Sequence, residues 1–392
     1  MNPLVASSPG RRSIAQSTLY ALKLIAINFV IFAILAELGS LVMVHWSKWP
    51  SSRPNYRANH QQFWVENDAA IGNWHPANGH FLHQDGCYSV EYFTNSYGAR
   101  DVERSLHSTQ PRTIVLGDSM IEGLGLTADE RLTNILEKQT GREHLNFGIG
   151  GTGPLQYALL YKTMAAKFDH NVVMVGVLPD NDFHDMDVAY NRQNGRGNVY
   201  RPYYADDFSI FYTGHFEPNT LDDNFDYVED YLRGYLASYH VVQYLYNRLY
   251  WGSFREYSRP YSGYNDFTDV DLARLKRALE DIKSTADAHG ARVAVFLIPR
   301  TMDFRRLHES HQDRLGPLME QWGQANGIPI KDLLPEMDAR AGADYKSYFL
   351  LCDNHWSPHG SAVAADVLLP WLGYGQSTEE LASGLNRHTC SN

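Results

Sequence analysis

The sequence is poor in cysteine and in basic residues, and both shortages exclude classes of protein. Its three cysteines, Cys87, Cys352 and Cys390, are too few and too scattered for a disulfide framework in a chain of 392 residues. A single disulfide between two of them is possible, and the sequence does not assign the pair. Lysine and arginine number 34 against 45 acidic residues, which gives a formal charge of −11. A nucleic-acid partner is therefore not expected, because the cationic surface that neutralises phosphates is missing.

The chain has one long hydrophobic run, which extends from Leu19 to Trp46. It is long enough to cross a bilayer as a helix, and it lacks the short apolar core and small-residue cleavage site of a signal peptide. We therefore expect a tail over residues 1–18 and an uncleaved transmembrane signal anchor over 19–46. Basic residues flank both ends, and the short first flank favours a cytoplasmic N-terminus. Glu37 lies inside the run, and we expect it near an interface or a neighbouring helix.

The next segment has no clear periodicity, and we expect it to be a connecting region over residues 47–109. Histidine, tryptophan and tyrosine are frequent in it. By residue type, His75, His80, His83 and Cys87 are candidate metal ligands. Their spacing matches no standard zinc pattern, so we expect neither a metal nor a cofactor.

From residue 110 onward, short apolar runs alternate with helical patterns, which predicts a parallel sheet covered by helices on both faces. We expect an α/β domain over residues 110–375 and a C-terminal tail over 376–392. Thr127 and Glu130 form a capping-box pattern at the first helix. The predicted strands are 113–117, 144–147, 172–178, 292–298 and 328–331, and the predicted helices are 127–140, 154–168, 268–289, 307–325 and 359–372.

An aromatic-rich insertion over residues 184–265 interrupts this alternation and holds more than half of the tyrosines. Helical spacing in 224–251 joins Tyr227, Tyr231, Tyr235, Tyr239 and Val242. We interpret this stripe mainly as core of an extra helical layer. Because the insertion follows the third strand, some of its aromatic residues could overhang the carboxyl edge of the sheet and stack on sugars.

Residues with catalytic potential follow the carboxyl ends of the strands, where ligands of open α/β sheets bind. A Gly-Asp-Ser turn ending at Ser119 follows the first strand, a glycine-rich turn containing Gly151 follows the second, and Asn181 follows the third. Asp353 and His355 lie before the last helix. A serine nucleophile needs a base, a group that orients the base, and donors for an oxyanion. His355 can be that base, with Asp353 holding its other ring nitrogen.

These four blocks, in this order, resemble the SGNH/GDSL hydrolase family over about residues 110–373. The resemblance implies a three-layer α/β/α sandwich with a parallel, flavodoxin-like sheet. It implies that Ser119 is the nucleophile, His355 the base and Asp353 the residue that orients His355. It also implies an oxyanion hole made of the N–H groups of Ser119 and Gly151 and the side chain of Asn181.

Asp353-Asn354-His355-Trp356 is the main departure from the family pattern, which is Asp-x-x-His. The shorter block is similar to the membrane-associated or periplasmic branch that transfers or removes acetyl groups on polysaccharides, alginate acetylation proteins included. His359 is a competing base, but it fits better at the start of the last helix. The glycine run 148–153 lacks the spacing and the acidic partner of a dinucleotide loop. The acidic residues after the third strand are interpreted as solvated charges rather than a calcium site: Asp180, Asp182, Asp185 and Asp187.

Together these features predict a single-pass membrane protein with an extracytoplasmic hydrolase domain. We expect it to cleave acyl (acetyl) esters of a cell-envelope carbohydrate or lipid through an acyl-enzyme. A polysaccharide O-acetyltransferase with the same triad is the first alternative, and a catalytically silent envelope binding or scaffold protein is the second. The expected partners are the ester substrate, the membrane through residues 19–46, and proteins of an envelope polysaccharide pathway.

Overall fold

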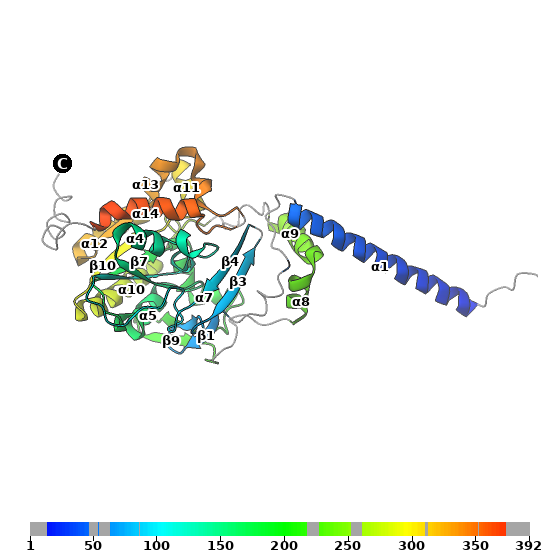
Figure 1. The fold of residues 1–392 in the computed structure, drawn as a ribbon, viewed down its shortest axis with the longest axis horizontal. Coiled ribbons are helices and arrows are strands. Elements are labelled where there is room, and N and C mark those ends of the chain that lie inside the picture. Colours follow the sequence, from blue (N-terminus) through cyan, green and yellow to red (C-terminus); the bar gives the residue numbers. More distant parts are fainter. Residues whose placement is uncertain are drawn as a thin grey trace, which may run out of the picture.

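A five-stranded parallel sheet lies at the centre of the fold in the computed structural model of the protein (Figure 1). The structure describes residues 14–46, 54, 63–85, 87–217, 227–251, 261–309, 313–351 and 353–373. The strands of this sheet are β5 (Arg112–Gly117), β6 (Glu143–Gly148), β7 (Val172–Val177), β10 (Arg292–Leu297) and β11 (Ile330–Asp332). Their spatial order is β6-β5-β7-β10-β11, which is the 2-1-3-4-5 order of flavodoxin-like sheets. The predicted fold class is therefore confirmed.

Helices cover both faces of the sheet. Figure 1 shows α4 and α14 on one side of β7 and β10, and α5 and α10 on the other. Because both faces are covered, β5 and β7 are buried at every position, as their apolar sequences predict. The helices of this domain are α3 (Ser119–Glu122), α4 (Leu132–Thr140), α5 (Pro154–Thr163), α6 (Pro179–Asp185), α7 (Val188–Gln193), α10 (Asp269–Ala288), α11 (Thr301–His308), α12 (Leu315–Asn326), α13 (Leu334–Ala341) and α14 (Pro358–Leu372).

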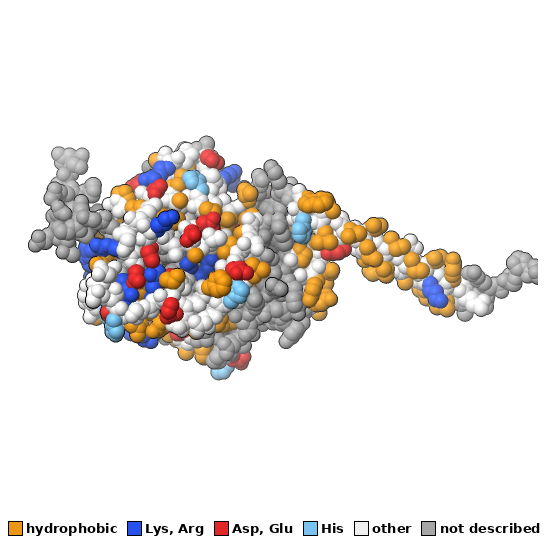
Figure 2. Space-filling view, in the orientation of Figure 1, with side chains coloured by type: hydrophobic (Ala, Val, Ile, Leu, Met, Phe, Trp, Pro, Cys, Tyr) orange, Lys and Arg blue, Asp and Glu red, His pale blue; other side chains and the backbone are white. Residues whose placement is uncertain are grey.

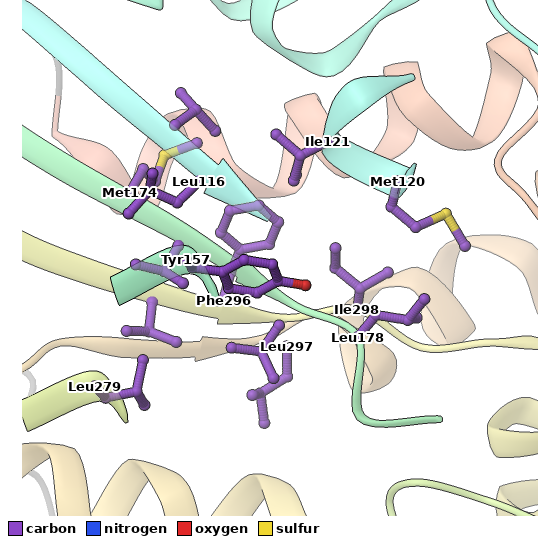
Figure 3. Packing of buried hydrophobic residues seen from close by; sticks show 14 of the residues in the cluster. Leu116, Met120, Ile121, Tyr157, Met174, Leu178, Leu279, Phe296, Leu297 and Ile298 are labelled. Atoms are coloured by element: carbon purple, nitrogen blue, oxygen red, sulfur yellow. The ribbon is translucent and has the colours of Figure 1, made fainter. Parts of the chain in front are cut away.

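The core lies between the sheet and these helices. Figure 3 shows Leu116, Met174 and Phe296, from three neighbouring strands, packed with Ile121 and Tyr157. Ile121 belongs to the short helix α3, so the first turn after β5 is tied directly into the core.

Most predicted elements are confirmed, and the exceptions occur in the helices. The Thr127–Glu130 capping box is present, but it opens a 3₁₀ turn (Ala128–Glu130), and α4 starts only at Leu132. The helix predicted over 307–325 is confirmed from Leu315 onward as α12, but its predicted start is wrong, because Thr301–His308 forms a separate helix, α11. Gly316 explains the position of α12: a Cβ there would lie 2.2 Å from Oδ2 of Asp332, so this helix start packs directly against β11.

Residues 63–109, which show no periodicity in the sequence, form two antiparallel hairpins against the domain. The strands are β1 (Val65–Asp68), β2 (Gly72–Trp74), β3 (His80–Asp85) and β4 (Tyr88–Phe93). Ile71, Trp74 and Ala99 belong to the main core, while Phe63, Phe81 and Tyr92 form a smaller cluster. A third hairpin, β8 (Arg201–Tyr204) and β9 (Ile210–Thr213), follows α7.

Helix α1 (Ile14–Trp46) is long and apolar enough to cross a membrane. Its last turns pack against α9 (Ala237–Trp251), which follows α8 (Tyr227–Tyr235). The backbone N–H groups of Ala237 and Ser238 donate to the Glu37 carboxylate at 2.6 and 3.0 Å. The expectation that Glu37 lies against a neighbouring helix is therefore confirmed.

The expectation that the aromatic stripe of 224–251 is core is wrong for Tyr231, Tyr235 and Val242, which are exposed. Both faces of the sheet are already covered by other helices. The buried face of α9 instead carries Ala237 and Val241, and it packs against α1. Tyr239 is half-buried, and the side chain of Tyr227 lies outside the described residues.

Candidate active site

Ser119 is the first residue of α3, directly past the carboxyl end of β5. Asp118 is the N-cap of this helix, and its carboxylate accepts from the Met120 N–H at 2.9 Å. The turn is tight because Ile121 folds back over β5, and a Cβ on Gly117 would lie 2.2 Å from Cγ1 of Ile121. The order of the strands reverses between β5 and β7, and Ser119 lies beside this switch point, where ligands of such sheets bind.

His355 reaches Ser119 from a turn more than 230 residues later in the chain. Its Nε2 lies 2.7 Å from Oγ of Ser119, so the hydroxyl can donate to the ring. Its Nδ1 lies 2.9 Å from Oδ2 of Asp353, an ion-pair contact whose angle is too bent for a good hydrogen bond. Catalytic hydrogen bonds are often poorly aligned before substrate binds. The Asp-x-His spacing therefore brings a carboxylate to the ring, as the Ser-His-Asp prediction requires.

The base of this turn is closed by an isolated antiparallel bridge between Phe349 and Trp356. The Trp356 side chain is buried in the core, which fixes the residue that follows His355. Ser357 then caps α14, and its hydroxyl accepts from the Gly360 N–H at 3.1 Å. His359 lies in the first turn of α14 with its ring 5.3 Å from that of Tyr348, so the structure places it in the helix, as expected.

The charges around the triad favour an ionised Asp353. Burial alone would raise its pKa, but the neighbouring His355 and the Arg300 guanidinium outweigh burial and hold the pKa of Asp353 well below its ordinary value. Burial dominates at Asp118, where it raises the pKa to about 6. The two carboxylates near Ser119 therefore differ, and Asp353 is the one suited to stabilise a positively charged His355.

The glycine-rich turn after β6 borders Ser119. A Cβ on Gly150 would lie 3.6 Å from the Ser119 Cβ. Gly151 has a φ of +71°, a left-handed conformation that glycine adopts without strain. The carbonyl of Gly150 accepts from Asn73 Nδ2 at 3.1 Å, and that of Gly151 accepts from Arg201. The predicted oxyanion donor, the Gly151 N–H, thus belongs to a turn that is held from two sides.

Glu122 holds the same turn through a hydrogen bond to its backbone, a role that the sequence analysis did not assign. It is fully buried at the end of α3. Its Oε2 accepts from the Gly150 N–H at 2.6 Å, and its Oε1 accepts from Trp64 Nε1 at 3.1 Å and lies 3.3 Å from His75 Nε2. The sequence signal that could have identified it is its position: Glu122 is an acidic residue that directly follows the apolar residues Met120 and Ile121. Its partners Trp64 and His75 lie far away in sequence.

Asn181 and Asp182 lie in the first turn of α6, past the carboxyl end of β7. Asn181 lies there half-buried, and its oxyanion role stays a prediction. Asp182 is not solvated, contrary to expectation: it is fully buried, and it accepts from the Tyr157 hydroxyl at 2.7 Å and the Leu178 N–H at 2.8 Å. Asp185 is buried too, with Oδ1 3.1 Å from Arg201 Nη2. Asp180 pairs with Arg300 at 2.7 Å, and Asp187 caps α7. The expectation of solvated charges is wrong for Asp182 and Asp185, because α6 packs over the strand ends.

A polar cavity of about 370 Å³ opens beside Asn181 and Arg300. Oδ2 of Asp185 and Nε of Arg300 are buried and have no hydrogen-bond partner among the described residues. Asp185 and Arg300 both line the cavity, and Arg300 also forms an ion pair with Asp180. Its lining residues are Asp180, Asn181, His184, Asp185, Tyr190, Asn194, Arg196 and Arg300.

The four residues considered as metal ligands have other neighbours. His75 faces Glu122 and the carbonyl of Gly98, and His80 lies 3.6 Å from Glu91. His83 contacts the hydroxyls of Tyr92 and Tyr88 at 2.9 and 3.2 Å. Cys87 is disulfide-bonded, and the other two cysteines lie outside the described residues. Over the part of the chain that the structure describes, no group of three or more histidine, cysteine or acidic side chains is arranged to hold a metal ion.

Comparison with known proteins finds distant likenesses among solved structures. No family model and no curated protein matches the chain. Solved structures to which it is similar include a GDSL-like lipase from Bacteroides thetaiotaomicron VPI-5482, with 12% identity, 70% of this chain and 93% of the other covered, and a TM-score of 0.36. A lipase/acylhydrolase from Enterococcus faecalis has 15% identity, 67% and 95% coverage, and a TM-score of 0.33. A member of the lipolytic protein G-D-S-L family from Veillonella parvula DSM 2008 has 11% identity, 66% and 96% coverage, and a TM-score of 0.33. Likeness at this level establishes no activity, so the chemistry must come from the site itself.

Proposed function

We propose that this chain is a serine-dependent ester hydrolase that works through an acyl-enzyme. The observation that carries the proposal is the contact of 2.7 Å between Ser119 Oγ and His355 Nε2, with Asp353 2.9 Å from the other ring nitrogen. A hydroxyl, an imidazole and a carboxylate in this order form the arrangement that activates serine for attack on a carbonyl.

In the proposed reaction, Ser119 Oγ attacks the ester carbonyl carbon while His355 Nε2 takes the hydroxyl proton. The tetrahedral intermediate collapses, the C–O bond to the alcohol breaks, and His355 returns the proton to the departing oxygen. Water then attacks the acyl-serine, with His355 again as base, and the acid leaves as Ser119 regains its proton. The N–H groups of Ser119 and Gly151 and the Asn181 amide would stabilise both oxyanions.

The polar cavity supports a carbohydrate ester as the substrate, with acetyl as the expected acyl group. Its lining of polar and charged side chains suits an alcohol rich in hydroxyl groups rather than a lipid chain. The same cavity could hold a sugar that accepts the acyl group in place of water, which is the O-acetyltransferase alternative. The two reactions differ only in whether water or this acceptor reaches the acyl-serine first.

The disulfide at Cys87 supports an oxidising, extracytoplasmic location for the domain, with α1 as its single membrane anchor. Proteins of an envelope polysaccharide pathway are the partners that this location and a sugar ester would imply.

The test is turnover of p-nitrophenyl acetate by the full chain in detergent, beside Ser119→Ala and His355→Ala. We expect each variant to lose activity on the order of a thousandfold. Ser284→Ala, on the exposed face of α10, and His359→Ala, on α14, are matched controls that should retain activity. If the wild type turns over no faster than Ser119→Ala, the hydrolase proposal fails and the silent scaffold alternative replaces it. Adding acetylated and free oligosaccharides then separates hydrolysis from transfer by the product formed.

A further inference from the structure

Helix α9 has two apolar faces, one buried and one exposed. One face packs against the end of α1, where Ala237 and Val241 form a cluster with Val44. The other carries Val242, Leu245, Tyr246 and Leu249, which are 64, 43, 55 and 81% exposed. The spacing i, i+3, i+4, i+7 places these four side chains in one stripe. We call it the α9 stripe.

Helix α8 has a matching exposed row. Val228, Tyr231 and Tyr235 follow the spacing i, i+3, i+7 and are 68, 60 and 46% exposed. Figure 2 shows hydrophobic side chains, in orange, along α1 and continuing over the α8–α9 pair. Contiguous apolar surface of this kind marks an interaction site on a soluble or membrane-anchored protein.

The place of α9 along α1 indicates what covers the stripe. From Leu19 to Glu37, α1 rises about 27 Å, at about 1.5 Å per residue, close to the bilayer hydrocarbon thickness of about 30 Å. If the span starts at Leu19, Glu37 lies at the edge of the hydrocarbon. Glu37 holds the first turn of α9 through the N–H groups of Ala237 and Ser238, at 2.6 and 3.0 Å. This contact fixes the first turn of α9 at that level, and Val241 packs beside Val44, so α9 continues along the last apolar turns of α1, inside the span predicted over 19–46.

The carboxylate also suits that depth. The first N–H groups of a helix have no partner within the helix and carry its positive dipole end, so they stabilise an anion. A carboxylate in lipid is costly unless it is hydrogen-bonded. Glu37 and the start of α9 therefore satisfy each other at the boundary between lipid and water.

We propose that the α8–α9 pair is an interfacial membrane element that inserts the α9 stripe and the α8 row into the bilayer beside α1. Interfacial helices bind by burying an apolar face among the headgroups and the upper acyl chains. The protein would then contact the membrane at two places, the span of α1 and the face of α8–α9. Two contacts restrict rotation and tilt of the domain relative to the membrane, which a single helix with a linker does not.

The test places an environment-sensitive fluorescent amino acid at one site of the full chain, reconstituted in phosphatidylcholine vesicles with nitroxide-labelled lipids. The probed positions are Leu249 in the α9 stripe, Phe29 in α1 as the membrane control, and Val270 on α10 as an equally apolar exposed control. We expect quenching at Phe29 and Leu249 and none at Val270. Circular dichroism and gel filtration of each substituted protein check that it is folded.

Quenching at Phe29 without quenching at Leu249 overturns the proposal. A second copy of the chain on the stripe would give that result together with a dimer that Leu249→Gln dissociates and Val270→Gln does not. Absence of quenching at Phe29 also overturns it, because α1 would then not lie in the bilayer. None of these outcomes depends on ester hydrolysis.

Discussion

Replacing Glu122 by glutamine isolates the buried network beneath the catalytic turn. The amide keeps the volume of the side chain but turns one oxygen acceptor into a donor. If its oxygen stays with the Gly150 N–H, its NH₂ group faces Trp64 Nε1, another donor. Trp64 Nε1 also lies 3.3 Å from Oε2, so the retained oxygen can accept from both donors, but each charged hydrogen bond becomes a neutral one. We expect a loss of about 2–4 kcal/mol in the free energy of unfolding.

For a domain of this size, such a loss corresponds to a fall in Tm of roughly 5–15 °C. The Gly150 N–H anchors the turn that contains the predicted oxyanion donor, the Gly151 N–H. We therefore expect kcat for p-nitrophenyl acetate to fall as well, by about 10–100-fold, which is less than the loss on removing a donor outright. Thermal unfolding by circular dichroism and steady-state kinetics below the new Tm measure the two effects separately. Glu280→Gln, on the exposed face of α10, is the matched control. Wild-type Tm and kcat in Glu122→Gln would refute the proposed role of this network.

Two other changes examine the surroundings of the site. Arg100 donates to the carbonyls of Glu122, Gly123 and Leu126 at 2.6–2.8 Å, so Arg100→Lys should lower the free energy of unfolding in urea by about 3 kcal/mol, whereas the exposed Arg305→Lys should change it little. Equal stability of both variants would contradict this. Burial lowers the pKa of His83 to about 4, so its neutral form stabilises the fold above pH 6.5, and this contribution, at most about 3 kcal/mol, is lost as the pH falls through about 4. Urea titrations from pH 7 to 4 should therefore show a smaller loss in His83→Gln than in the wild type, and parallel curves would exclude the effect.

The sheet could be predicted because its signals are local. Strands buried on both faces are continuous apolar runs, and β5, β7 and β10 are found within a residue or two of their predicted bounds. The start of the helix predicted over 307–325 was misplaced, and the position of α12 depends on long-range packing. That packing is the approach of Gly316 to Asp332, which no local pattern contains.

Ser119 could be placed for the same reason, since it follows a strand that ends at the ligand-binding edge of the sheet, and His355 reaches it from the turn before α14. The supporting residues could not be found in this way. Arg300 reaches Asp180 across 120 positions, and Trp64 reaches Glu122 across 58. A Gly-Asp-Ser turn can be recognised from the sequence alone, whereas the sequence does not distinguish a buried arginine from an exposed one.

The fold concentrates buried acidic side chains at the edge of the sheet that carries Ser119, and this concentration carries information about function. Asp182 and Asp303 are fully buried, and burial raises the pKa of Asp303 to about 7. Hydrophobic side chains of similar volume would often be as stable or more stable at such positions. The buried acids instead fix turns: Asp182 accepts from the Leu178 N–H where β7 ends, and Asp303 accepts from the Arg300 N–H after β10. The backbone groups that they hold are close in sequence to residues that line the polar cavity. Leu178 is near Asn181, and Arg300 lines the cavity itself. Rigid placement of polar groups at the cost of stability is what a preorganised catalytic or binding site requires.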